Sequence, residues 1–141
     1  MISKAALRKT MKQRLKTLPP EQFRAEGIEA ASRIQRTSLW SQYETILAYL
    51  SMDGEIDTEP LLEAAFSDRK RVLVPKVSGE DLRFFRINSL AGPWQYGAFG
   101  IREPQTDDRD DLLGLKDFPV LIIVPGVAFT QTGERMGHGR G

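Results

Sequence analysis

The stretch TILAYLSMDGEIDTEPLLEAAFSDRKRVLVP, residues 45–75, decides the fold. Its two short apolar runs, residues 45–51 and 71–75, are typical of buried strands. Between them, Thr58 can cap a helix that has Pro60 in its first turn and an apolar inner face. A strand, a helix and a strand at this spacing predict a βαβ unit. We therefore expect an α/β fold with a mostly parallel sheet flanked by helices and a right-handed crossover.

Two helices are predicted before this unit. Leucines and a methionine recur at helical spacing over residues 3–18, and Ser3 can serve as the N-cap. The proline pair at 19–20 ends this helix and opens the next, because proline suits only the first turn of a helix. The second helix is predicted over residues 21–38.

Three further segments follow the unit. Residues 81–87 predict another strand, and residues 89–111 predict an irregular connection. The continuous apolar run at 120–124 is typical of a strand at the centre of a parallel sheet. The chain of 141 residues shows no internal repeat, so we expect one domain, since domains commonly have about 100–150 residues.

The composition excludes several classes of protein. There is no cysteine, which rules out a disulfide framework and a cysteine nucleophile. The N-terminus lacks the apolar core of a secretory signal, and no apolar run approaches the ~20 residues that cross a membrane. We expect a cytoplasmic protein without a membrane partner.

Charge is unevenly distributed, although the net charge is only +1. The first twenty residues contain six basic residues and no acidic one. Lys4, Arg8 and Lys12 are spaced four apart and so line one side of the predicted helix. A basic helix in a nearly neutral chain indicates a local anion site rather than a nucleic-acid surface, and a plain solvated face is the alternative.

The last segment, VPGVAFTQTGERMGHGRG at residues 124–141, predicts a phosphate-binding loop beyond a buried strand. Glycines let backbone N–H groups approach phosphate oxygens, and Arg135 and Arg140 supply fixed cationic forks. Phe129 is expected to pack back on the sheet. A flexible glycine-rich tail is the alternative. The loop and the basic helix could converge on a triphosphate.

Other candidates lie near predicted strand ends. Glu55 follows the first strand and could accept hydrogen bonds from amino or amide groups of a ligand, or be an ordinary exposed acid. His138 is the only histidine, and we interpret it as a loop side chain rather than a general base. Strand alternation makes one of two adjacent phenylalanines core. The aromatic residues that could wall a pocket are Phe84, Phe85, Trp94, Tyr96 and Phe99.

Five motifs in order along the chain resemble the 5-formyltetrahydrofolate cyclo-ligase family, also called 5,10-methenyltetrahydrofolate synthetase. They are KAALRK (4–9), AYLSMDGEIDTEPLL (48–62), VLVPKV (72–77), FGIREP (99–104) and IIVPGVAFTQTGERMGHGRG (122–141). The resemblance implies a fold similar to that of sugar-phosphate isomerases and CoA transferases. It also implies ATP-dependent cyclisation of 5-formyltetrahydrofolate to 5,10-methenyltetrahydrofolate with Mg²⁺. We expect a monomer.

The resemblance carries roles to matching positions. Arg135 is implied in catalysis. The implied ATP contacts are Lys4, Ala5, Ala6, Leu7, Arg8, Arg135, Met136, Gly137, His138, Gly139, Arg140 and Gly141. The implied substrate contacts are Leu50, Met52, Glu55, His138, Gly139, Arg140 and Gly141, with Glu55 toward the polar edge of the pterin.

The family pattern continues past the glycine loop into a Tyr-Tyr-Asp stretch, a helix and further sheet, whereas this sequence stops at Gly141. The resemblance therefore implies that C-terminal elements are missing, including an aspartate expected near magnesium. The metal ligands stay unassigned. One alternative is a non-catalytic folate- or nucleotide-binding remnant. Another is a sugar-phosphate or CoA-handling enzyme on the same fold, with Glu55 as its only candidate acid.

Overall fold

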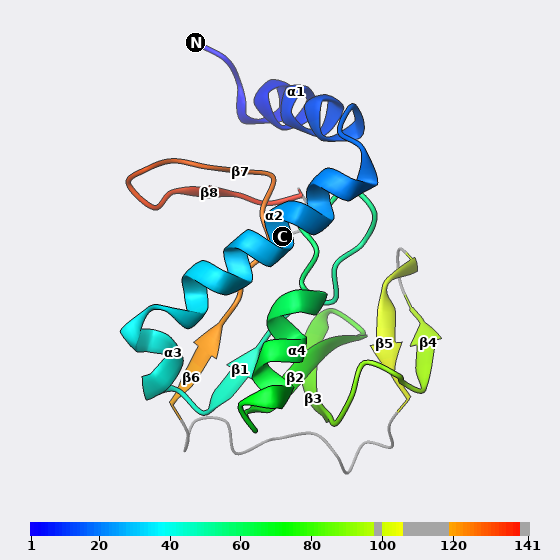
Figure 1. Cartoon of the computed structure of the whole chain (residues 1–141). Helices are drawn as coiled ribbons and strands as arrows, with labels where there is room; N and C mark the ends of the chain where they lie inside the picture. The colour runs from blue at the N-terminus through cyan, green and yellow to red at the C-terminus, as the bar shows by residue number, and fades with distance from the viewer. Residues whose placement is uncertain (98–99, 106–118, 139–141) are drawn as a thin grey trace.

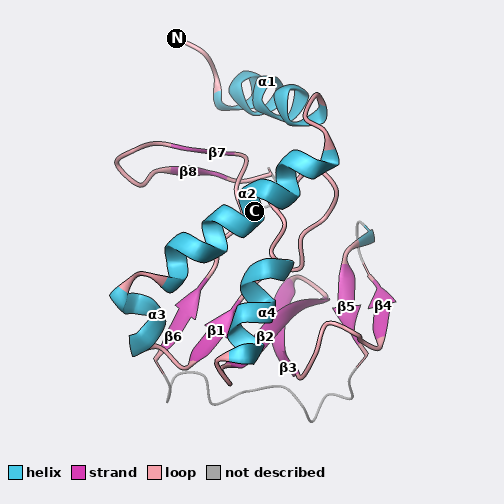
Figure 2. Cartoon of the chain, in the orientation of Figure 1, coloured by secondary structure: helices cyan, strands magenta, loops and turns pink. Residues whose placement is uncertain are grey.

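The computed structural model describes residues 1–97, 100–105 and 119–138 (Figure 1). The helices are α1 (Lys4–Lys16), α2 (Pro20–Gln35), α3 (Ser38–Gln42) and α4 (Glu59–Ser67). The strands are β1 (Thr45–Leu47), β2 (Arg71–Ser78), β3 (Asp81–Ile87), β4 (Trp94–Tyr96), β5 (Arg102–Pro104), β6 (Val120–Ile122), β7 (Ala128–Phe129) and β8 (Arg135–Met136). Figure 2 distinguishes the helices from the strands by colour.

The central sheet has four strands in the order β3-β2-β1-β6. β1 pairs in parallel with both β2 and β6, and β3 pairs antiparallel with β2. The helix α4 connects β1 to β2, as the βαβ pattern predicts. The expected α/β class with a mostly parallel, helix-flanked sheet is thus confirmed.

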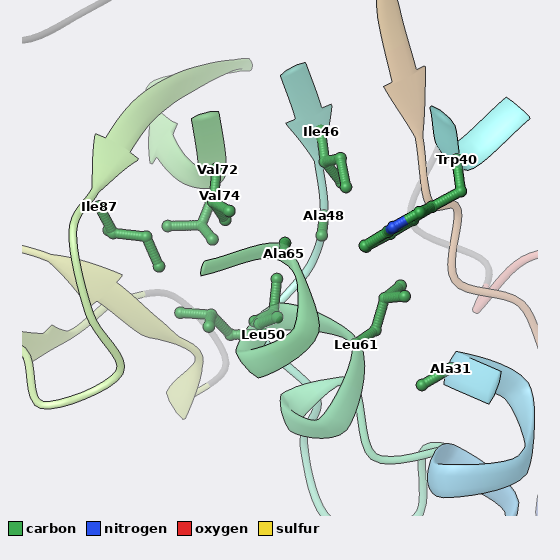
Figure 3. Packing of buried hydrophobic residues seen from close by; sticks show 11 residues of the cluster. Ala31, Trp40, Ile46, Ala48, Leu50, Leu61, Ala65, Val72, Val74 and Ile87 are labelled. Atoms are coloured by element: carbon green, nitrogen blue, oxygen red, sulfur yellow. The ribbon is translucent and has the colours of Figure 1, made fainter. Parts of the chain in front are cut away.

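The core lies between the sheet and the helices α2, α3 and α4 (Figure 3). Ile46 and Val74 of the sheet are fully buried, and they pack in one cluster with Leu61 of α4 and Ala31 of α2. Apolar side chains that leave water together contribute about 25 cal/mol per Å² of buried area, so this cluster holds the helices on the sheet. It also fixes the strand ends from which the functional loops leave.

The first three helices differ from the prediction mainly at their boundaries. Ser3 caps α1 as expected, because its Oγ accepts from the Ala6 amide at 3.1 Å. The predicted second helix at 21–38 instead ends at Gln35, and a short separate helix, α3, follows. Trp40 explains α3: its ring is 5 % exposed and its Nε1 donates to Asp68 Oδ2 at 2.7 Å. Such long-range packing leaves no periodic signal in the sequence.

Thr58 stands at the N-cap position of α4 without capping the helix through its side chain. Its hydroxyl instead donates to the Tyr49 carbonyl at 2.9 Å and accepts from the Ser51 amide at 3.1 Å. The predicted first strand is shorter than expected for the same reason. The Ala48 amide still donates to the Leu73 carbonyl of β2 at 3.0 Å, and beyond it Tyr49 and Ser51 bond to Thr58, just before α4.

The predicted irregular connection at 89–111 contains a β-hairpin, β4–β5, and residues 106–111 lie outside the described residues. The buried Glu103 anchors this hairpin by accepting from the Val77 amide at 2.7 Å. Three-residue strands are too short to reveal themselves by alternation. Phe85 is fully buried and Phe84 is not, which confirms that strand alternation makes one of the two a core residue. Tyr96 is 74 % exposed, so the predicted aromatic wall is wrong there. Phe99 lies outside the described residues.

The strand at 120–124 was expected at the sheet centre, but β6 lies at the edge of the described sheet and Ile122 is 54 % exposed. An apolar run alone does not distinguish the centre of a sheet from its edge. The expectation that Phe129 packs on the sheet is also wrong, since it is 62 % exposed. The end of its ring lies against Gly126, where an added Cβ would sit 2.5 Å from Phe129 Cζ.

Candidate active site

Two loops leave the same edge of the sheet. β1 and β6 are adjacent and parallel, so their carboxyl ends lie side by side, which is where ligands bind in open α/β sheets. The loop at 48–57 follows β1, and the segment at 123–138 follows β6 and forms the hairpin β7–β8. In Figure 1 the helix α1 lies at this end of the molecule, above the hairpin. Three segments far apart in sequence therefore surround one region.

A polar network ties down the β1–α4 loop at Asp57. The carboxylate accepts from the Glu59 amide at 2.9 Å, from Arg24 Nη1 at 2.9 Å and from Ser51 Oγ at 3.3 Å. Burial raises the pKa of Asp57, but these hydrogen bonds and the charge of Arg24 outweigh burial, and the pKa is lowered overall. Asp57 therefore remains a carboxylate that holds the loop against α2 and α4.

Gly27 lets α2 come unusually close to this loop. The Asp57 amide donates to the Phe23 carbonyl at 3.2 Å, and a Cβ added at Gly27 would sit 2.1 Å from the Asp57 carbonyl oxygen. Only glycine fits this approach of helix and loop. The close contact makes the loop part of the rigid framework.

The Glu55 carboxylate is fixed within its own turn. Its Oε1 accepts from the Met52 amide at 2.8 Å, and the Glu55 amide donates to the Met52 carbonyl at 3.1 Å. The side chain is only 16 % exposed, so the alternative of an ordinary exposed acid is wrong. Leu50, another predicted substrate contact, is 3 % exposed and belongs to the hydrophobic core. Met52 is partly exposed at the rim of the turn.

Sequence reasoning missed Tyr49, which is partly buried beside this turn. Burial, reinforced by the negative charge of Glu55, raises the pKa of Tyr49 to about 12. The phenol thus keeps its proton at neutral pH and can donate a hydrogen bond to a ligand. The sequence feature that could have indicated this role is a tyrosine near the carboxyl end of the predicted first strand.

The predicted glycine loop begins as a hairpin. β7 and β8 pair, with the Val127 amide donating to the Met136 carbonyl at 2.7 Å, and Gly133 takes a positive φ of 93° at the tip. Arg135 is exposed, and its Nη1 donates to the Pro125 carbonyl at 2.9 Å. Met136 and Gly137 are partly buried. The predicted contacts Gly139, Arg140 and Gly141 lie outside the described residues.

The basic helix meets the hairpin through two side chains. Arg8 Nε donates to the Gly137 carbonyl at 3.0 Å, and Lys12 Nζ donates to the His138 carbonyl at 2.9 Å. Both cations are partly buried, so a purely solvated face is wrong for them. Lys4 on the same side is exposed, as are Ala5 and Ala6, while Leu7 is partly buried.

His138 joins the two halves of the region. Its Nε2 lies 3.6 Å from Glu55 Oε2, and its side chain is 32 % exposed. This separation exceeds a direct hydrogen bond, so the carboxylate and the imidazole each keep capacity for a ligand. The structure therefore brings together Arg8, Gly137 and His138 from the predicted ATP set with Glu55 from the predicted substrate set.

The region gathers positively charged side chains near one carboxylate. Within residues 1–97, 100–105 and 119–138, no three histidine, cysteine, aspartate or glutamate side chains stand close enough together to hold a metal ion. Arg8, Lys12 and Arg135 supply positive charge from α1 and β8, and Glu55 supplies negative charge from the β1–α4 loop. Such an arrangement suits a ligand with phosphate at one end and hydrogen-bond donors at the other.

Comparison with known proteins gives one consistent result. The family model described as "5-formyltetrahydrofolate cyclo-ligase family" matches residues 1–141. The 5-formyltetrahydrofolate cyclo-ligase of Escherichia coli (strain K12) is 36 % identical over 134 residues, which cover 93 % of this chain and 72 % of the relative. The probable 5-formyltetrahydrofolate cyclo-ligase of Schizosaccharomyces pombe is 28 % identical, with 99 % of this chain and 69 % of the relative covered.

A solved structure supports the same assignment. The NMR structure of Aquifex aeolicus 5,10-methenyltetrahydrofolate synthetase superposes with a TM-score of 0.81 at 30 % identity, covering 99 % of this chain and 69 % of the other. The fold, the ordered motifs and these relatives agree. The chain belongs to the 5-formyltetrahydrofolate cyclo-ligase family of enzymes.

Proposed function

We propose that this chain uses ATP to cyclise 5-formyltetrahydrofolate to 5,10-methenyltetrahydrofolate, with release of ADP and phosphate. The observation that carries the proposal is the junction at His138. There the segment held by the cations of α1 meets the loop that carries Glu55. A nucleotide on one side and a folate on the other would face each other across this junction.

The phosphates of ATP would lie against α1 and the end of β8. Arg135 is exposed and fixed by one hydrogen bond from Nη1, which leaves other donors of its guanidinium for phosphate oxygens. Lys4 is exposed on the side of α1 that carries Arg8 and makes no hydrogen bond or ion pair among the described residues. Gly137 leaves room for the Arg135 guanidinium, because an added Cβ would sit 3.1 Å from Arg135 Nη1.

The pterin would lie against the β1–α4 loop. Glu55 Oε2 is not bonded within the turn, so it can accept from the amino and amide N–H groups at the pterin edge. The protonated Tyr49 hydroxyl can donate to a carbonyl nearby. A carboxylate and a phenol on a fixed turn would select the polar edge of the ring and orient the folate.

The chemistry requires activation of an amide. The oxygen of the formyl group carried by N5 is a poor leaving group. It therefore attacks the terminal phosphorus of ATP, and ADP leaves. N10 then attacks the formyl carbon and loses its proton, and the C–O bond breaks to release phosphate and the methenyl product. Arg135 would neutralise charge on the transferring phosphoryl group. The rest of the site positions the two reactants, and we assign no general base.

Magnesium enters the proposal only as the ion that accompanies ATP. Because the described residues contain no metal-binding cluster, we assign Mg²⁺ no protein ligand and derive no step through it. Magnesium is commonly bound through substrate phosphates and one or two carboxylates.

The location and the partners of the protein are also part of the proposal. We predict a cytoplasmic location, a monomeric state and no nucleic-acid or membrane partner. For the described part of the chain, no helix has the length and apolarity to span a bilayer.

The test follows the methenyl product by its absorbance after the protein is mixed with ATP, Mg²⁺ and 5-formyltetrahydrofolate. The proposal predicts product that depends on all three additions. Calorimetry in parallel measures binding of ATP and of the folate separately. Binding of both ligands without product would support a non-catalytic binding protein. Binding of a sugar phosphate but not of folate would support a sugar-phosphate enzyme on the same fold.

A further inference from the structure

Lys12 is the cation of α1 whose contact lies nearest the folate side of the junction. Its Nζ donates to the backbone carbonyl of His138 at 2.9 Å, across 126 residues of sequence. The imidazole of that residue faces Glu55 Oε2 at 3.6 Å. The Glu55 carboxylate is itself held by the Met52 amide. A series of contacts therefore runs from the helix, through His138, to the candidate folate loop, with a hydrogen bond on each side of the 3.6 Å approach of His138 to Glu55.

The contact is selective among the lysines of α1. Lys16 lies one turn further along the same side of the helix; it is exposed and makes no hydrogen bond or ion pair among the described residues. α1 contains no buried residue, so packing alone holds it weakly. The bonds from Arg8 and Lys12 to consecutive carbonyls thus account for the docking of α1 on this segment.

We propose that Lys12 is a positioning residue: it holds the backbone of His138 so that the imidazole stays beside Glu55 and the proposed folate contacts are already in place before the ligand binds. This inference rests on the proposed function, in which Glu55 contacts the folate, and on the substrate contact that the family resemblance implies for His138. Lys12 is already occupied by a carbonyl, so its effect reaches the folate through the loop. Because a preformed pocket binds with less ordering cost, loosening His138 weakens folate binding.

The experiment measures binding of 5-formyltetrahydrofolate by calorimetry without ATP, so that direct contact with phosphate cannot contribute. Four proteins are compared: wild type, Lys12→Met, Lys12→Arg and Lys16→Met. The Lys12→Met substitution raises the folate Kd about five- to tenfold. Lys12→Arg, which keeps a charged donor, and Lys16→Met, which removes an uninvolved charge, stay within about twofold of wild type.

A double-mutant cycle separates positioning from a general structural role. In a His138→Ala background the carbonyl remains but the imidazole is gone. Adding Lys12→Met there changes the folate Kd by less than about twofold, because the two residues act as one unit. A full Lys12→Met effect in that background, or a Lys12→Met effect no larger than that of Lys16→Met, would overturn the inference.

The outcomes also separate this inference from the proposed function. If wild type binds folate and forms product but Lys12→Met leaves the folate Kd unchanged, only the positioning role of Lys12 fails. If wild type binds neither folate nor ATP, the proposed function fails and the inference fails with it. Unfolding curves of each variant verify that a change in Kd is not a loss of fold.

Discussion

The loop at 48–57 and the segment at 123–138 follow neighbouring parallel strands and reach the same region, yet they are built differently. The first is anchored in the core by Leu50 and held by the network around Asp57. The second is a two-stranded hairpin with an exposed tip, contacted by cations of a helix that buries no residue. We call the loop at 48–57 the rigid wall and the segment at 123–138 the exposed wall. A fixed surface suits shape-specific recognition of a ring, and exposed cationic side chains suit a polyphosphate.

The largest contrast is expected in stability. Leu50→Ala removes a side chain that is 3 % exposed, and truncating a buried leucine typically costs about 2–5 kcal/mol of unfolding free energy. The matched change Phe129→Ala, at a position that is 62 % exposed, costs less than about 1 kcal/mol. Urea unfolding of both variants measures the difference. Equal costs would show that the hairpin is as firmly packed as the loop.

Arg135→Ala probes the exposed wall. The variant loses a charged donor that we assign to phosphate, and such bonds contribute about 1.5–3 kcal/mol, so the Kd for ATP rises about tenfold or more. Calorimetry with ATP and Mg²⁺ measures this effect, and binding of 5-formyltetrahydrofolate alone is the control that stays near the wild-type value. An unchanged ATP affinity would contradict the role of Arg135.

Gly27→Ala disturbs the rigid wall where α2 contacts it. The new Cβ meets the Asp57 carbonyl oxygen, so α2 and the loop must separate, and overpacking of this kind costs about 1–3 kcal/mol. The folate KM also rises because the loop shifts, while the Kd for ATP changes little. Ala25→Ser, at an exposed position of the same helix, is the matched control. An ATP defect as large as the folate defect would mean that the walls move together.

The smallest effect is a pH dependence of stability. The pKa of Asp57 is lowered in the folded state, so its stabilisation is present above the unfolded pKa, near 3.9, and is lost as the pH falls through the folded value. Asp57→Asn therefore removes about 1 kcal/mol at pH 7 and flattens the fall in unfolding free energy below about pH 4. If the unfolding free energy of wild type and variant fell equally with decreasing pH, the result would argue against the stabilising network around Asp57.

The sequence predicted the framework because the relevant signals are local. Apolar runs and the prolines before α2 and in α4 indicated the strands and helices, and the motifs indicated the family. α3 and the β4–β5 hairpin were missed, since Trp40 and Glu103 hold them through long-range contacts. The exposed positions of Ile122 and Phe129 were missed because hydrophobicity does not say which face is covered.

The candidate site was predictable residue by residue but not as an arrangement. Arg8, Glu55 and His138 were all candidates, yet no spacing indicated that α1 contacts the carbonyls of Gly137 and His138 or that the imidazole faces Glu55. These contacts join segments from opposite ends of the chain. Tyr49 became a candidate only from the structure, through its burial and its raised pKa.

The central claim is that the two walls form one ATP–folate site, and turnover of a Glu55→Gln variant tests it most directly. The methenyl product is followed by absorbance while either 5-formyltetrahydrofolate or ATP is varied. We predict product from wild type, and in the variant a folate KM raised about tenfold with an ATP KM within about twofold of wild type. Absence of wild-type product despite binding of both ligands, or an unchanged folate KM in the variant, would contradict the account.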